Sequence, residues 1–107
     1  MAEDYSKQIM VTGQRINHCI PLYYSAKEGS NWLSARSLND ELYENYWKLY
    51  QLYSMGLDKM DAKLKQEPAN KEVKSCRREL ASIREKCVNS MNSLLEDSIK
   101  LVFLTEK

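Results

Sequence analysis

The chain has 107 residues and a formal net charge of +1 at pH 7, and 43% of its residues are hydrophobic. A chain of this length is expected to form one domain, and this composition is too apolar for an intrinsically disordered protein. The balanced charge gives no general attraction to nucleic acid or to an acidic membrane surface. Three glycines and two prolines leave few positions for turns, which favours long helices over a many-stranded sheet.

Cysteine usage and the apolar pattern indicate an intracellular protein. Cys76 and Cys87, if they lie on one helix, are separated by roughly 16 Å along its axis, too far for a disulfide, and Cys19 leaves an odd count. The polar, acidic start from Met1 to Tyr5 lacks the apolar stretch of a secretory leader. No run approaches the roughly 18 apolar residues of a membrane span. We therefore expect a cytoplasmic protein without a membrane segment, and a nuclear location stays open.

A first helix is predicted over residues 4–26, because apolar residues recur there at steps of three and four. Pro21 lies inside this range and is expected to kink or break the helix, since proline lacks a backbone donor. Gly13 lies on the apolar stripe, where the missing side chain would let another helix approach closely. The members of the stripe are Tyr5, Ile9, Gly13, Ile16, Ile20 and Tyr23.

A connector is predicted over residues 27–36, followed by a second helix over residues 38–66. Ser37 is the expected N-cap, because serine before an apolar run accepts hydrogen bonds from free amide groups. Trp32 falls inside the connector, where an exposed indole is unfavourable. We expect Trp32 to fold back over the end of the bundle or to bind a partner.

The second helix carries two neighbouring apolar stripes, which distinguishes it from an ordinary surface helix. Both stripes are rich in aromatic residues, so this helix should contact two neighbours at once. The first stripe consists of Leu42, Tyr46, Leu49, Tyr53, Gly56 and Met60, and the second of Tyr43, Trp47, Tyr50 and Leu57.

A third helix is predicted over residues 71–104, with Asn70 as its N-cap. Its apolar seam follows heptad spacing and is then expected to shift by one residue. The predicted seam runs through Val73, Cys76, Leu80, Ile83 and Cys87, and continues after the shift through Met91, Leu95, Ser98 and Val102.

These elements predict an all-α fold, an antiparallel three-helix bundle with long, coiled-coil-like second and third helices. The link between those two helices is only about four residues long, which forces an antiparallel hairpin. The first helix is too short to cover the hairpin, so apolar surface should stay available. A second copy of the chain, forming a homodimer, or another helical protein would cover it.

The candidate partner-binding surface is the aromatic stripe, since tyrosine and tryptophan dominate the binding energy of many interfaces. Its predicted members are Tyr43, Trp47, Tyr50 and Leu57, with Trp32 as a further contact. Val102 and Phe103 lie in an apolar segment near the C-terminal end and are the predicted oligomer contact. The alternative is that the aromatic residues are simply the core of the bundle.

A second hypothesis is nucleic-acid binding by Lys74, Arg77 and Arg84, which fall roughly along one face of the third helix. Glutamates 72, 79 and 85 interleave with these cations, so a mixed, solvated surface is the ordinary interpretation. The balanced net charge also makes nucleic acid an unlikely partner.

Catalytic, metal and cofactor sites are not expected. His18 and Cys19 are adjacent, and consecutive helical residues point about 100° apart, so they cannot form a nucleophile–base pair. One histidine and three scattered cysteines match no zinc spacing, and the sequence has no glycine-rich phosphate loop. The sequence therefore favours a binding protein over an enzyme.

Overall fold

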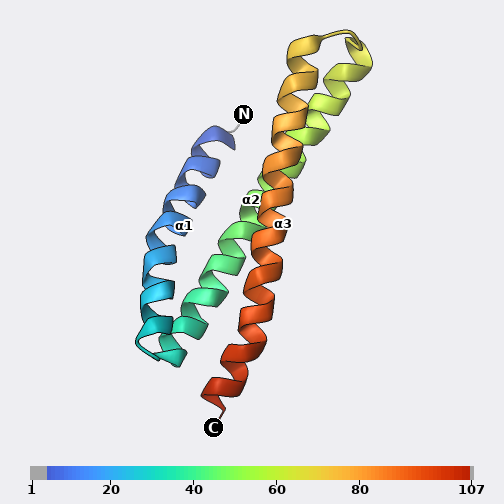
Figure 1. The fold of residues 1–107 in the computed structure, drawn as a ribbon. Coiled ribbons are helices and arrows are strands. Elements are labelled where there is room, and N and C mark those ends of the chain that lie inside the picture. The colour runs from blue at the N-terminus through green and yellow to red at the C-terminus, as the bar shows by residue number, and fades with distance from the viewer. Residues whose placement is uncertain (1–4, 107) are drawn as a thin grey trace.

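The computed structural model describes residues 5–106 and shows an all-helical protein (Figure 1). Its elements are α1 (Tyr5–Glu28), α2 (Trp32–Gln66) and α3 (Lys71–Thr105), and residues 5–106 contain no strand. The predicted all-α, three-helix architecture is confirmed. Asp4, where the first helix was predicted to begin, lies outside the described residues, as does the acidic start apart from Tyr5.

The second helix is central to the arrangement, because both of the others pack on it. α2 and α3 form a long antiparallel hairpin of two 35-residue helices, and α1, with 24 residues, lies against α2. No Cα atom of α1 comes within 8 Å of a Cα atom in α3 over the described chain. α1 thus flanks α2 over the half near their shared loop, and the far end of the hairpin extends beyond it (Figure 1).

The turn between α1 and α2 is much shorter than predicted. It consists of Gly29, Ser30 and Asn31, and the Asn31 side chain accepts a hydrogen bond from the amide of Ser34 at 3.3 Å. This cap starts α2 at Trp32, so the prediction of a connector over residues 27–36 with a cap at Ser37 is wrong. Asparagine satisfies a free amide of the first helical turn as well as serine does, and three residues suffice to reverse the chain.

The turn between α2 and α3 follows the sequence closely. α2 ends at Gln66, before the Glu67–Pro68 step, and α3 begins at Lys71. The Asn70 side chain accepts a hydrogen bond from the amide of Val73 at 3.1 Å, as an N-cap residue does.

Two residues of α1, Pro21 and Gly13, are the subject of specific sequence expectations. The helix continues through Pro21, whose side chain is exposed, so the chain is not broken there. A Cβ atom added to Gly13 would meet no atom within 4 Å, so no helix approaches closely at that point and that expectation is wrong. Gly13 lies in the half of α1 that is farther from the α1–α2 turn, where packing on α2 is looser.

The continuous hydrophobic core lies where all three helices overlap. Its buried members come from α1 (Ile16, Cys19, Tyr23), α2 (Ala35, Leu42, Leu49) and α3 (Cys87, Leu94, Leu101). Tyr46 and Tyr53 of the first predicted stripe pack against this core. Leu57 and Val73 are buried toward the far end of the hairpin and do not belong to the cluster.

The seam of α3 keeps one heptad register throughout, so the predicted one-residue shift is wrong. Leu94 and Leu101 are buried, whereas Leu95 is exposed. Polar residues occupy several alternating seam positions and hide this repeat in the sequence. The seam residues are Val73, Arg77, Leu80, Arg84, Cys87, Met91, Leu94, Ser98, Leu101 and Thr105, all of them buried or half-buried.

Candidate functional site

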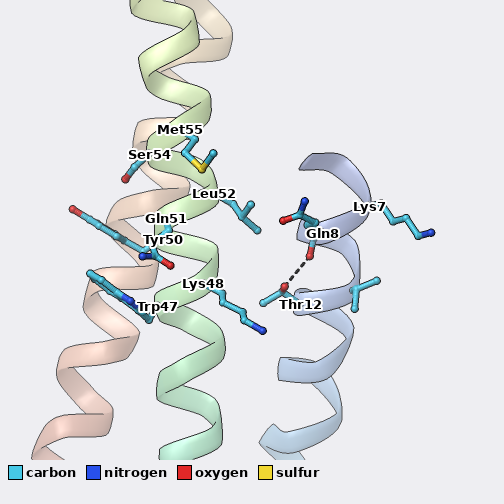
Figure 2. A pocket seen from close by; sticks show the side chains of 11 residues that line it. Lys7, Gln8, Thr12, Trp47, Lys48, Tyr50, Gln51, Leu52, Ser54 and Met55 are labelled. Carbon is cyan, nitrogen blue, oxygen red and sulfur yellow. Dashed lines mark hydrogen bonds between the residues drawn. The ribbon is translucent and has the colours of Figure 1, made fainter. Parts of the chain in front are cut away.

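A hollow with a volume of about 780 Å³ lies between the first half of α1 and the outer side of α2. Figure 2 shows that it extends from α1 across α2 to a pair of aromatic side chains. We call it the aromatic groove and define it by six of its lining residues: Val11, Thr12, Trp47, Tyr50, Leu52 and Met55.

Trp47 and Tyr50 form the aromatic wall of this groove. They lie three residues apart on α2, and their rings stack with centroids 5.5 Å apart and planes 9° from parallel. The guanidinium carbon of Arg84 lies 5.6 Å from the Tyr50 ring centroid and supports the ring from the α3 side. Trp47 keeps 47% of its surface exposed. The ring is therefore held in place and is still accessible.

The opposite wall is formed by α1. The Thr12 hydroxyl donates a hydrogen bond to the Gln8 carbonyl oxygen at 2.7 Å, so its polar group is satisfied within the helix. Val11 is exposed beside it, and the ammonium group of Lys59 lies 4.5 Å from the Tyr5 ring centroid. This cation–π contact links the start of α1 to α2 at one end of the groove.

The predicted partner-binding residues do not form one surface. Tyr43 is half-buried and packs against the core, and Trp32 does the same at the start of α2. Leu57 is 3% exposed and lies between α2 and α3, so its assignment to an exposed face is wrong. Leu57 lies 10 residues after Trp47. Because an α-helix has 3.6 residues per turn, this separation places Leu57 on the side of α2 that faces α3. Trp47 and Tyr50 are the members that line the groove.

The two residues of the predicted oligomer contact also differ in exposure. Val102 is half-buried, whereas the Phe103 side chain is 72% exposed. Leu95 and Ile99, which precede Phe103 by two turns and one turn, are also exposed. The predicted seam included Leu95, so this second apolar surface could not be recognised from the sequence.

The candidate nucleic-acid contacts are separated by their intramolecular bonds. Arg77 forms an ion pair with Asp61 across the hairpin, and this partner raises the pKa of Arg77. Arg84 donates a hydrogen bond to the Ser54 hydroxyl at 3.2 Å. Lys74 is exposed. Two of the three cations are therefore held in the α2–α3 seam, where their first role is to join the helices.

A partly buried polar junction joins all three helices, and no local sequence pattern indicates it. Tyr23 of α1 donates its hydroxyl to Asp97 of α3 at 2.8 Å and accepts a hydrogen bond from Asn39 of α2 at 3.1 Å. Asn39 also donates to the Leu94 carbonyl oxygen at 2.9 Å, and Lys27 donates to Asp97 at 2.8 Å. This junction is the direct link between α1 and α3 that backbone packing does not supply.

The burial and the hydrogen bonds of this junction shift the pKa values of Tyr23 and Asp97. Burial, together with the hydrogen bond to Asp97, raises the pKa of Tyr23 to about 12, although the bond from Asn39 acts in the opposite direction. Burial alone would raise the pKa of Asp97, but the hydrogen bonds from Lys27 and Tyr23 outweigh it, so this pKa lies below its usual value. Asp97 is therefore held as a carboxylate with two donors.

The thiol at Cys19 is inert rather than reactive. It is 1% exposed, and its S–H group donates a hydrogen bond to the Glu41 carboxylate. Burial and this hydrogen bond raise the pKa of Cys19 to about 11, which keeps it a thiol at neutral pH. His18 is exposed beside it, and across residues 5–106 no three His, Cys, Asp or Glu side chains are placed to hold a metal ion.

Comparison with protein-family models, with curated proteins and with solved structures found no match for this chain. None of the three described helices combines the length and the apolar character needed to cross a membrane. Any functional assignment therefore depends on the surfaces described above.

Proposed function

We propose that this chain is a protein–protein interaction module, an adaptor, assembly subunit or small scaffold that acts in the cytoplasm. Its partner is another helical protein, which places an apolar helix in the aromatic groove. The observation that supports this proposal is Trp47, a large aromatic side chain that is 47% exposed at the edge of a hollow of about 780 Å³.

The groove has the features of a site that receives a helix. Trp47 and Tyr50 are pre-positioned by stacking, so binding immobilises little additional side-chain freedom. Met55 and Val11 add flexible and branched apolar surface, both partly exposed. An amphipathic helix with apolar residues at steps of three and four would cover all four side chains and exclude water.

Charge at the groove favours a partner helix with acidic flanks. Lys48 lines the groove near α1 and points toward it (Figure 2). Lys59 lies one turn beyond Met55 along α2, above Tyr5. Acidic residues beside the apolar face of the partner would meet these ammonium groups, which would set its orientation more than its affinity.

The test compares two truncations with the same exposed fraction. Trp47→Ala removes the aromatic wall, and Leu22→Ala removes an apolar side chain that is also 47% exposed but lies outside the groove. Each immobilised variant is incubated with an extract of the source cells, and bound proteins are quantified by mass spectrometry. We expect at least one protein to fall about 30-fold with Trp47→Ala, corresponding to about 2 kcal/mol, and to stay with Leu22→Ala.

Circular dichroism provides the control for folding. Trp47→Ala should keep nearly the full helix content, because half of the indole already faces water. If Trp47→Ala unfolds, the residue belongs to the core and the proposal is wrong. The proposal also fails if both variants capture the same proteins in the same amounts.

Nucleic-acid binding is not the favoured function. Arg77 and Arg84 would have to leave Asp61 and Ser54 before they could contact phosphates, which adds an unfavourable step. Lys74 alone gives no basic patch of the size that such binding requires.

A further inference from the structure

A second apolar surface runs along the C-terminal half of α3. Leu95, Ile99 and Phe103 follow each other at steps of four residues, so they form one stripe along the helix. Leu95 is 48% exposed, Ile99 62% and Phe103 72%. We call these three residues the α3 stripe. Three large apolar side chains in a row, each about half exposed or more, form an apolar surface whose contact with water is unfavourable.

The rest of the bundle leaves the α3 stripe uncovered. The seam residues Leu94 and Leu101 are buried against α2, and Asp97 turns toward Tyr23 and Lys27 of α1. The stripe therefore lies on the remaining side of α3, away from α1. Any surface that covers it completely has to come from another molecule.

We infer that the α3 stripe is a self-association surface on which a second copy of this chain packs in antiparallel orientation. The stripe is symmetric about Ile99, because Leu95 and Phe103 each lie four residues from it. A twofold axis at Ile99 brings the two Ile99 side chains together and places each Leu95 opposite Phe103 of the second copy. An isologous interface requires this kind of self-complementary pattern.

Charge complementarity at one edge of the stripe selects the second copy and its orientation. Glu96 and Lys100 are both exposed and lie four residues apart along this edge. In the antiparallel pair, Glu96 lies only about 3 Å along the axis from Lys100 of the second copy. In a parallel pair, the twofold axis runs along the helices and places this edge on opposite sides of the two copies, so Glu96 and Lys100 would find no partner charge in the second copy. The antiparallel homodimer is therefore the arrangement in which apolar and charged groups both match.

This surface does not depend on the aromatic groove, and its test measures mass instead of partner capture. The contact is small, so we expect a dimer that dissociates in the micromolar range. Sedimentation equilibrium of the full chain from about 1 to 500 µM should show a transition from 12.5 kDa to twice that mass. A monomer over the whole range would overturn the inference.

A pair of matched variants locates the contact. Ile99→Glu places two carboxylates at the twofold axis and should abolish the dimer. Met10→Glu makes the same change at a residue of α1 that is 56% exposed, and it should leave the dimer intact. If Ile99→Glu still dimerises like the parent chain, the α3 stripe is not the interface.

A charge exchange tests the orientation. Glu96→Lys alone should weaken the dimer about 10-fold, because two lysines of each copy then face lysines of the other. The double variant Glu96→Lys with Lys100→Glu should restore dimerisation, since it recreates the opposite pairs. In a parallel dimer, positions 96 and 100 of the two copies lie on opposite sides of the contact in all three proteins, so equal affinities would refute the antiparallel arrangement.

Discussion

The two halves of α1 are anchored very differently. Its C-terminal half places Ile16, Cys19 and Tyr23 in the continuous core and adds the junction with Asn39 and Asp97. In the N-terminal half, the described residues before Gly13 include one buried side chain, Thr12, and exposed Met10 and Val11. The same helix thus closes the bundle at one end and leaves a groove at the other.

This difference indicates how stability and recognition are divided in the molecule. Where three helices meet, apolar burial and a satisfied polar network hold the chain in a single arrangement. Where α1 packs more loosely on α2, apolar side chains of both helices stay accessible to a partner. Local stability is expected to be lower there, which is typical of surfaces that accept a partner.

The largest expected effect comes from truncating one leucine at each end of the hairpin. Leu42 is 2% exposed within the three-helix core, and Leu57 is 3% exposed between α2 and α3. Leu42→Ala should lower the free energy of unfolding by about 4 kcal/mol, and Leu57→Ala by about 2–3 kcal/mol, because a two-helix contact relaxes into a cavity more easily. Urea unfolding measures both values. Equal losses, or a larger loss at Leu57, would contradict the expectation that the three-helix end is packed more tightly than the two-helix end.

A smaller effect concerns the charge of Asp97 in the polar junction. Its pKa is lowered in the folded state, so the ionised form stabilises the fold above the ordinary carboxyl pKa of about 4. This contribution is lost as the pH falls through the lowered, folded-state pKa. Asp97→Asn keeps the shape and removes the charge, and it should reduce the free energy of unfolding at pH 7 by about 1–2 kcal/mol.

The pH dependence separates charge from shape at Asp97. The difference between Asp97→Asn and the parent chain should shrink when urea unfolding is repeated near pH 3, because the parent carboxyl is then partly protonated. Other carboxylates, such as Asp61 beside Arg77, titrate in both proteins and cancel in the difference. A difference that stays constant between the two pH values would show that the Asp97 charge does not stabilise the junction.

The sequence predicted helix content and hairpin geometry well, because both depend on local signals. Heptad spacing marks α2 and α3, and Asn70 with Pro68 marks the turn between them. The start of α2 was misplaced, since Asn31 follows Gly29 and Ser30 and resembles loop sequence. Only the hydrogen bond to Ser34 distinguishes an N-cap from a loop residue.

The functional surfaces were harder to predict for a physical reason. Periodicity shows which residues share a helix face, but it does not show where the neighbouring helix lies. Leu57 and Trp47 share a stripe by spacing, yet one is buried and the other lines the groove. Arg77 and Arg84 look like surface cations, although each bonds to α2 within the seam. The junction of Tyr23 with Asp97 joins residues 74 positions apart, which no local pattern indicates.

The proposed docking of a partner helix requires that Trp47 stays accessible in the isolated chain. Acrylamide quenching of the Trp32→Phe variant reports on Trp47 alone, and the Trp47→Phe variant reports on half-buried Trp32 as the matched control. At low protein concentration, we predict red-shifted emission and clearly stronger quenching for Trp47 than for Trp32. Equal, weak quenching of the two indoles would mean that the aromatic groove is closed and that no partner helix can bind to Trp47.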